Sequence, residues 1–551
     1  MTKYNIILVF FIVLFSSSCG DFTDLEGNLE NPNEVNPSQL DPNLLLNNIQ
    51  LEFGDFFYEA SETGMELTRM FAMTGGDAYT RAYQPQNHDE IWGRGYQDVI
   101  NQIDKLLIAV EGKSLFIHAG SAKVMKAYTL LTLVDLFGDV PYSTALKGDI
   151  GEFDPTIDKG KDVYEAAIKL LDEAIADLAK PALSKPTRDI YYNSDAAKWS
   201  ALARTLKLKS YVNMRVSEAP NNAEISKLLG EDLVDTGAEN FTYKYGTSDV
   251  PSRSRQPYYR LMYDPVEGSA GGYLGNFFLK TAYDAKGIED PRWRYYFSRQ
   301  IGSLDKGLEV DPESLPCGLT PRPNHYTPDM PYCSFDPGFY GRDHGNNDGT
   351  PPDSRAITTV GVYPFGGRVD DITSPTTESV TKQGQGANGA GIEPIWMSSF
   401  TSFLRAEALL ILDNDAPGAK NAMVDGVQKS IAQVQSFGAS KGQVPTAPVT
   451  PTADYVDVVS TKFDVSPDKL NIIMTEYYIA LFGNGVEAYN MYRRTGKPAN
   501  MQLMRAVSPG SFQRSLVYPS DFVNLNINAT QKSFTDLPRV FWDNNPIDFV
   551  K

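Results

Sequence analysis

Apolar side chains recur at three- and four-residue steps through much of this sequence, and this periodicity constrains the fold more than any other feature. Such steps place the apolar residues on one face of an amphipathic helix. Pro181 follows one periodic segment, and Asn193 with Ser194 forms a candidate N-cap before another. The segments predicted to be helical are residues 43–71, 90–111, 117–137, 161–180, 195–215, 396–412 and 468–490.

The length of these helices, and the small residues at their contact positions, predict a mainly α fold. We expect helix–turn–helix pairs stacked as in tetratricopeptide arrays, although no strict repeat of about 34 residues is visible. Between about residues 241 and 395 the helical period largely disappears, and glycine, proline, asparagine and aromatic residues dominate. We therefore expect one domain over residues 41–551, in which a scaffold (about 41–240 and 396–551) carries a large loop-rich insertion. Loops on a rigid scaffold often carry the binding surface.

The N-terminus has the pattern of an export signal. Lys3 precedes ten apolar residues, 6–15, which are too few to span a bilayer core of about 30 Å but fit a secretory signal. The sequence SSSC at 16–19 is typical of a bacterial lipoprotein signal, so we expect a signal peptide at 1–18 and lipidation of Cys19. The alternative is an ordinary cleaved signal with a chance cysteine. Residues 19–40 are polar and turn-rich, which predicts a lipidated tether.

Composition narrows the possible functions. With 69 acidic and 50 basic side chains the net charge is −19, which argues against a nucleic-acid binder, because such proteins need a basic face. HExxH, GxSxG and P-loop motifs are absent from the sequence, which argues against the enzyme classes that carry them, and no cofactor is expected. A structural Ca²⁺ in the loop that contains Asp343 is left open. In an exported protein Cys317 and Cys333 are expected to form a disulfide rather than to remain free thiols.

Several motifs, in order along the chain, resemble a known family. They are DLFGDVPYS (135–143), FYGRDHG (339–345), GTPPD (349–353), YPFGG (363–367), EPIWMSS (393–399), AEA (406–408), ALFGNGVEA (480–488) and YRRTG (492–496). Together with the lipoprotein signal they are similar to the SusD/RagB family of nutrient-binding outer-membrane lipoproteins of Bacteroidetes, in its SusD-like branch. The resemblance covers nearly the whole chain.

This resemblance implies a tetratricopeptide-like scaffold with a variable ligand-binding insertion. It also implies a protein that is anchored to the outer membrane, faces the cell exterior and takes part in nutrient uptake. Such a protein captures oligosaccharides, as part of a polysaccharide utilization system, and delivers them to a SusC-like TonB-dependent transporter. It is not an enzyme. The alternatives are a peptide-binding lipoprotein of a RagAB-like uptake system and, less favoured, a surface glycosidase.

Glycan binding calls for aromatic rings that stack on the C–H faces of sugars and for planar polar groups that bind hydroxyl pairs. Three clusters in loops fit this requirement. The alternative for each ring is that it packs the insertion onto the helices. The candidate ligand-binding residues are Tyr79, Arg81, Tyr83 and Asn87 in the first cluster, Trp293, Tyr295 and Tyr296 in the second, and Tyr340, Arg342 and Asp343 in the third.

Other charged residues are expected to be structural. We expect Asp135 and Asp139 to cap a helix end and shape a turn, and Glu407 to be a paired carboxylate of the scaffold. Glu487 and the arginine pair at 493–494 are expected to form ion pairs. The basic stretch at 250–300 would suit an anionic glycan, but a solvated or ion-paired surface is the favoured interpretation. Its arginines are Arg253, Arg255, Arg260, Arg292, Arg294 and Arg299.

Overall fold

The computed structural model describes most of the chain. The described residues are 36–73, 78–217, 221–249, 253–263, 272–299, 334–335, 339–346, 357–370, 386–506, 508–534 and 538–550. The expected signal peptide, Cys19, Cys317 and Cys333 lie outside these ranges. Among the described helices, none combines the length and the apolar character that crossing a membrane requires.

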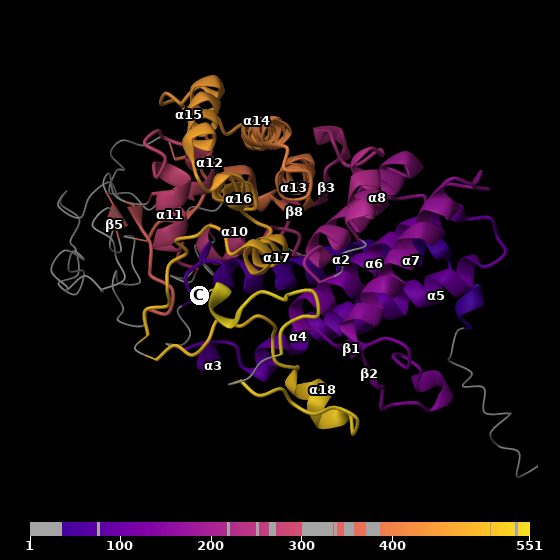
Figure 1. Cartoon of the computed structure of the whole chain (residues 1–551). Helices are drawn as coiled ribbons and strands as arrows, with labels where there is room; N and C mark the ends of the chain where they lie inside the picture. The colour runs from indigo at the N-terminus through magenta and orange to yellow at the C-terminus, as the bar shows by residue number, and fades with distance from the viewer. Residues whose placement is uncertain are drawn as a thin grey trace, which may run out of the picture.

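The first half of the scaffold is a layer of helices packed side by side, indigo to magenta in Figure 1. The side chain of Asp41 caps the longest of them by accepting from the backbone N–H of Asn43 at 2.9 Å, and Pro42 occupies its first turn. Three helical segments, α4 (Asp89–Gly93), η3 (Arg94–Ile100) and α5 (Asn101–Val110), follow one another without a gap and form one continuous helix. The elements are α2 (Pro42–Leu67), α4 (Asp89–Gly93), the π-helix η3 (Arg94–Ile100), α5 (Asn101–Val110), α6 (Phe116–Phe137), α7 (Gly160–Leu178), α8 (Ala196–Met214) and α9 (Asn221–Leu229).

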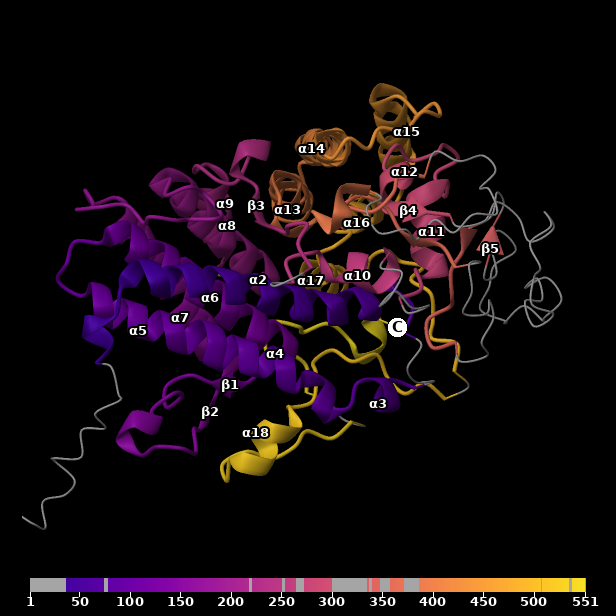
Figure 2. The ribbon, with the colours of Figure 1, turned by 180° about the vertical axis from the view of Figure 1, so that it is seen from behind.

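The second half of the scaffold follows the insertion and returns to α2. It consists of α13 (Ser398–Ile411), α14 (Ala416–Ser440), α15 (Thr452–Val465), α16 (Lys469–Ala480) and α17 (Gly485–Thr495), and Figure 2 shows α17 beside α2. The two backbones approach closely, since a Cβ atom on Gly485 would lie 2.0 Å from the carbonyl oxygen of Ser61. The Ser61 hydroxyl also accepts from the Gly485 N–H at 2.8 Å. The two halves of the chain therefore close onto one core.

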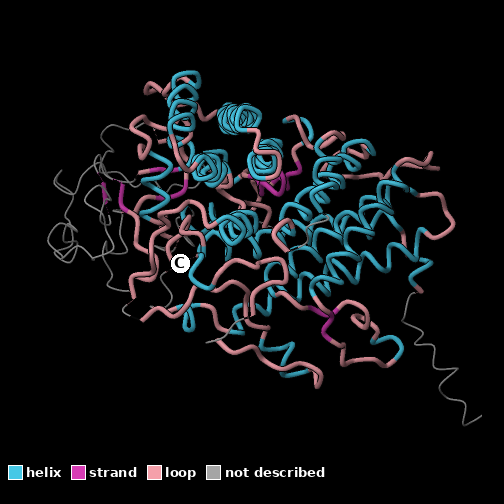
Figure 3. Tube along the Cα trace, viewed as in Figure 1, coloured by secondary structure: helices cyan, strands magenta, loops and turns pink. Residues whose placement is uncertain are grey.

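The insertion and the connections contain short elements (Figure 3). The strands pair in twos, always antiparallel: β1 (Val140–Pro141) with β2 (Ile157–Asp158), β3 (Phe241–Lys244) with β8 (Ile392–Trp396), β4 (Phe297–Ser298) with β7 (Thr359–Val360), and β5 (Ser334–Phe335) with β6 (Phe339–Tyr340). The short α-helices are α3 (Tyr79–Ala82), α10 (Pro257–Tyr263), α11 (Asn276–Tyr283), α12 (Trp293–Tyr296) and α18 (Ser520–Leu525). The 3₁₀ turns are η1 (Pro37–Gln39), η2 (Pro85–His88), η4 (Gly148–Ile150), η5 (Gly237–Glu239), η7 (Gly386–Gly389) and η8 (Ile547–Phe549).

The mainly α, tetratricopeptide-like prediction is confirmed, and most predicted helices agree with the structure within a few residues. The helix predicted at 468–490 is instead two helices, because Gly483 has φ +95° and Asn484 caps α17. The predicted cap of α8 is also wrong. Asn193 and Ser194 have positive φ, and Asp195 accepts from the first N–H groups of the helix. Helices α14 and α15 were not predicted.

Buried charged groups hold the scaffold together. Asp135 does not cap a helix as expected; it is fully buried and accepts hydrogen bonds from Lys209 at 2.8 Å, Asn490 at 2.8 Å and Trp542 at 3.0 Å. These contacts join α6 to α8, α17 and the C-terminal segment. Asp139 has the expected role, because it accepts from the N–H of Gly160 at the start of α7.

The paired-carboxylate prediction for Glu407 is confirmed. This fully buried residue accepts from Arg494 at 2.7 and 2.8 Å and pairs with Arg215 at 2.9 Å. Glu487 likewise pairs with Lys209 at 3.2 Å. These buried carboxylates are therefore paired within the scaffold.

Candidate functional site

The first and third predicted clusters come together beyond the end of α2. Arg69, fully buried, donates to the Tyr79 hydroxyl at 2.8 Å and to the carbonyl oxygen of Gln502 at 2.9 Å. The ring of Tyr79 stacks on Tyr83 with centroids 6.3 Å apart and lies 6.0 Å from the ring of His344. Residues that are distant in the sequence thus surround one guanidinium group.

The third cluster fastens the insertion to this region. Asp343, fully buried, accepts from the Asn276 side chain at 2.8 Å and from the Gln502 side chain at 3.0 Å. The guanidinium of Arg342 lies 3.9 Å from the ring centroid of Tyr273. Tyr340 is also buried, and its N–H donates to Thr358. Each of these contacts joins segments of the insertion or joins the insertion to the C-terminal part of the chain.

The second cluster lies apart from Arg69, against the scaffold. The ring of Trp293 packs edge-on against Tyr283 at 5.0 Å and Phe339 at 5.4 Å, and the Tyr296 hydroxyl donates to the carbonyl oxygen of Ile479 at 3.1 Å. Tyr295 is buried as well. The structure therefore places the six predicted aromatic rings inside the protein, whereas Arg81 and Asn87 are exposed. Ligand contact by the ten predicted residues stays a prediction.

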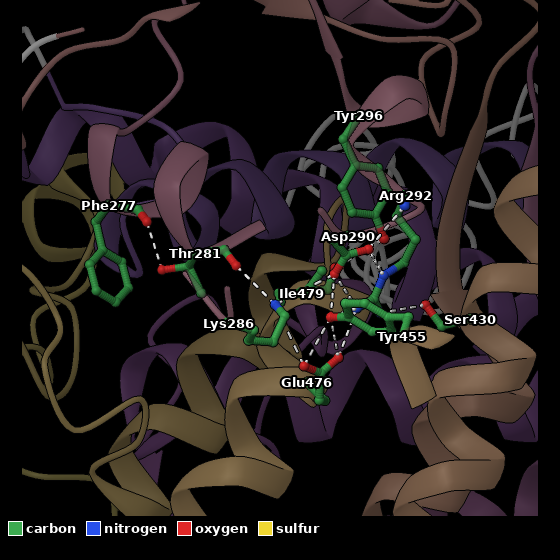
Figure 4. Close-up of polar contacts among 10 residues, drawn as sticks. All are labelled: Phe277, Thr281, Lys286, Asp290, Arg292, Tyr296, Ser430, Tyr455, Glu476 and Ile479. Carbon is green, nitrogen blue, oxygen red and sulfur yellow. Dashed lines mark hydrogen bonds and ion pairs between the residues drawn. The ribbon is translucent and has the colours of Figure 1, made fainter. Parts of the chain in front are cut away.

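The basic stretch at 250–300 is largely paired, but two of its arginines, Arg292 and Arg299, are buried in the protein and not at the surface that was expected. Arg292, fully buried, donates to Asp290 at 2.7 and 2.8 Å, to Glu476 at 2.8 Å and to Tyr455 at 3.1 Å (Figure 4). Burial alone would raise the pKa of Asp290, but the adjacent guanidinium outweighs it and holds that pKa below its usual value. Arg299 is paired too, with Asp370 at 2.9 Å. This network joins the insertion to α15 and α16.

A cavity of about 520 Å³ lies beside the Tyr79 cluster, between two C-terminal segments. Phe512 connects the two: it is among the residues that line the cavity, and its ring, which is buried, meets the ring of Tyr79 edge-on at 5.9 Å. Three phenylalanines and several planar polar side chains therefore line the same space. The lining residues are Ser511, Phe512, Arg514, Phe534, Pro538, Arg539, Val540, Phe541, Asp543, Asn544 and Ile547.

The polar wall of this cavity is held in place by the scaffold. Arg514 donates to Asp543 at 2.6 Å and to the carbonyl oxygen of Asn545 at 3.1 Å, and its own carbonyl oxygen accepts from Arg493 at 2.8 Å. The Asp543 charge is thereby neutralised within the wall. Arg539 and Asn544 are exposed at the cavity and offer planar donors to a ligand. Sequence reasoning missed this cavity, although Phe512 and Arg514 show the alternation of ring and planar polar group that singled out Tyr79 and Arg81.

Helix α2 presents a row of carboxylates at three- and four-residue spacing: Glu52, Asp55, Glu59, Glu62 and Glu66. Burial, and then the neighbouring Glu62 carboxylate, raises the pKa of Glu66 to about 8. Burial and repulsion from Glu90 raise the pKa of Glu59 to about 7. This row shows no metal-binding geometry: within the described ranges, no group of three or more His, Cys, Asp or Glu side chains could hold a metal ion.

Comparison with protein-family models gives two matches. Residues 32–311 match a SusD-like model described as starch-binding associating with outer membrane. The chain belongs to the SusD-like family. Residues 375–537 of this SusD-like chain match a second model, described as SusD and RagB outer membrane lipoprotein. A comparison with curated proteins found no match.

Solved structures share the SusD-like fold. A chitin-binding protein matches with 20% identity and a TM-score of 0.66, over 92% of this chain and 100% of that one. A chitin-binding SusD homologue from Flavobacterium johnsoniae matches with 17% identity and a TM-score of 0.64, over 92% and 98% of the two chains. A SusD/RagB family protein from Bacteroides thetaiotaomicron matches with 18% identity and a TM-score of 0.61, over 89% and 95%.

Proposed function

We propose that this SusD-like protein is a non-catalytic lipoprotein at the cell surface that binds an oligosaccharide in the 520 Å³ cavity and passes it to a SusC-like transporter. The arrangement of the cavity carries the proposal. Phe534 and Phe541, which are partly exposed, supply apolar rings, and Arg539 and Asn544 supply planar donors. Rings and fixed polar groups of this kind suit the alternating C–H faces and hydroxyl pairs of sugars.

The same cavity favours binding over hydrolysis. Glycoside hydrolysis uses a pair of carboxyl groups about 5–10 Å apart. Among the lining residues Asp543 is the one carboxylate, and Arg514 already binds it. A peptide ligand, the second candidate, would pair its backbone with rows of exposed N–H and C=O groups. The phenylalanines and the planar polar side chains among the lining residues instead provide groups that suit sugar rings and hydroxyl pairs, which supports a glycan.

Calorimetric titration tests which class of ligand the protein binds. Residues 20–551 are titrated with oligosaccharides of N-acetylglucosamine, with malto-oligosaccharides and with mixed oligopeptides. We expect saturable binding of one glycan class, weakened at least tenfold in Phe541→Ala, because the lost ring face is worth about 1.5 kcal/mol or more. Phe153→Ala, which removes an exposed ring elsewhere, is the matched control. A heat of binding with the peptides and with none of the glycans would contradict glycan binding. Hydrolysis of a bound glycan would contradict the non-catalytic assignment.

An apolar patch supports a protein partner. Ile150 and Phe153, in the loop between β1 and β2, are exposed, as are Leu525 and Ile527 at the end of α18. Hydrogen bonds hold the two segments together: Ile527 N–H donates to the Asp154 side chain at 2.9 Å. In Figures 1 and 2 these elements lie at one end of the molecule and α15 lies at the other. Contiguous exposed apolar side chains of this kind mark interaction surfaces.

We propose that the SusC-like transporter binds this patch, and co-purification tests this contact. A SusC-like transporter co-expressed with the full-length protein should be retained by the wild type and by Val465→Glu, which alters an equally exposed side chain on α15. Ile527→Glu should reduce retention at least tenfold, because a charge would be desolvated at the interface. Equal retention of the two variants would exclude this patch as the docking surface.

A further inference from the structure

A second cavity, of about 200 Å³, lies between the insertion and the C-terminal half of the scaffold. It shares no lining residue with the 520 Å³ cavity. Its walls come from α11 and the residues after it, from α15, from α16 and from the segment after α17. The lining residues are Thr281, Ala285, Lys286, Val459, Lys462, Asn471, Ile472, Thr475, Glu476, Pro498 and Asn500.

The cavity shares Lys286 and Glu476 with the charged network of Figure 4. The side chain of Lys286 is 9% exposed, and its ammonium donates to the carbonyl oxygen of Thr281 at 3.1 Å. The same ammonium lies 3.6 Å from a carboxylate oxygen of Asp290 and 3.6 Å from one of Glu476, beyond the usual hydrogen-bond distance. Because an ammonium carries three N–H donors, Lys286 keeps donor capacity for a ligand.

Two of the acceptors at this cavity, Glu476 and the Asn471 side-chain oxygen, are already used. Glu476 accepts from Arg292 at 2.8 Å and from Tyr455 at 3.0 Å. The side-chain oxygen of Asn471 accepts from the Ala499 N–H at 2.8 Å. Among the other polar groups of the lining residues, the ammonium groups of Lys286 and Lys462 can only donate, and the NH₂ group of Asn471 is a further donor, whereas the Asn500 amide offers both a donor and an acceptor.

The charge balance around the cavity agrees with this donor excess. Lys286, Arg292 and Lys462 carry three positive charges, whereas Asp290 and Glu476 carry two negative charges. A ligand with one negative charge would bring the net charge of these groups and the ligand together to zero. Partly desolvated ammonium groups bind carboxylates more strongly than exposed ones, because the local dielectric is lower.

The remaining wall is apolar, formed by Ala285, Val459, Ile472 and Pro498, and suits the C–H face of a sugar ring. The volume is below the roughly 300–1,000 Å³ of pockets for drug-sized ligands, so the ligand is about one sugar unit in size. We propose that this cavity binds a single hexuronate unit, with its carboxylate toward Lys286 and Lys462. The inference rests on the proposed glycan-binding function and extends it to acidic glycans.

The test is ligand-observed NMR on residues 20–551 with glucuronate, glucose and acetate. Glucuronate should saturate the site, whereas glucose should show no saturable binding and acetate should bind at least tenfold more weakly. Lys462→Met should weaken glucuronate binding at least tenfold. Lys420→Met is the matched control: it removes an ammonium group on α14 that pairs with Asp464 outside the cavity, and it should leave binding unchanged.

Asn500 is exposed at the rim of the cavity, so Asn500→Asp should not disturb folding. The carboxylate that it introduces should also weaken glucuronate binding. Equal binding of glucose and glucuronate, or unchanged binding in both Lys462→Met and Asn500→Asp, would overturn the inference. Phe541→Ala separates the two sites, because it should leave glucuronate binding intact. If the protein binds a neutral oligosaccharide but not glucuronate, this inference alone is refuted. If it binds glucuronate but no neutral oligosaccharide, the proposed role of the larger cavity is refuted.

Discussion

The buried guanidinium of Arg292 provides the sharpest test of how the insertion is attached to the scaffold. Replacing it with methionine keeps much of the side-chain volume and removes the positive charge. Asp290 and Glu476, which accept from Arg292 at 2.7–2.8 Å, would then keep the Tyr455 hydroxyl as a donor and Lys286, at 3.6 Å, as a nearby cation. Two carboxylates in a buried site with one distant cation are poorly compensated.

The expected loss of stability follows from these contacts. Removing one partner of a buried ion pair costs about 3–5 kcal/mol. At about 2.1 cal mol⁻¹ K⁻¹ per residue, the unfolding entropy of 551 residues is about 1.2 kcal mol⁻¹ K⁻¹, so a loss of 4 kcal/mol lowers Tm by about 3 °C. The matched control is Arg405→Met, whose partly exposed pair with Asp235 should contribute about 1 kcal/mol or less.

Chemical denaturation gives the free energy of unfolding, and hydrogen exchange locates the damage. Arg292→Met should speed amide exchange in α11 and α12 of the insertion and leave α7 unchanged. The double variant with Glu476→Gln should cost less than the sum of the single variants by at least about 1 kcal/mol, since the second change removes one unpaired carboxylate. A loss in Arg292→Met no larger than in Arg405→Met would refute the reasoning.

Three further predictions concern other parts of the chain. Burial raises the pKa of Glu66 to about 8, so its folded form holds a proton that the unfolded chain releases near pH 4.5; native stability should fall as pH rises between these values. Glu66→Gln should then stabilise the protein by roughly 2 kcal/mol at pH 9 and little at pH 4.5, and equal effects at both would contradict this. Gly485→Ala should destabilise by about 3 kcal/mol because its Cβ meets Ser61, whereas Gly93→Ala, with open space around it, should gain about 0.5–1 kcal/mol in the same denaturation experiment. Cys19→Ser should release the full-length protein from the membrane fraction, and unchanged retention would exclude the lipid anchor.

The helical scaffold could be predicted because the apolar periodicity that specifies each helix lies within one continuous stretch of sequence. The stripe that predicted a helix at 161–180 is the buried face of α7, observed at Gly160–Leu178. Helix α14 escaped prediction because its buried face mixes Ala422, Gly426 and Ser430 with a few larger apolar residues, which blurs the period. A short break such as Gly483 is likewise hard to place inside an apolar run.

The candidate site could be predicted only in part, because burial depends on distant partners. Tyr79 looks like an exposed stacking platform in the sequence, but the guanidinium of Arg69 and the ring of Phe512 enclose it. Asp343 looks like a ligand contact, but Gln502, 159 residues further on, binds it. The aromatic composition of a site is visible in sequence, whereas the choice between a ring that packs and a ring that binds is made by long-range contacts.

A crystal structure with the oligosaccharide that binds most tightly in the calorimetric panel tests the central claim most directly. We expect a sugar ring stacked on Phe541 or Phe534 within the 520 Å³ cavity, with hydroxyl groups in hydrogen-bond contact with Arg539 or Asn544. A glycan bound elsewhere, for example at the exposed Arg81 with the cavity unoccupied, would contradict it.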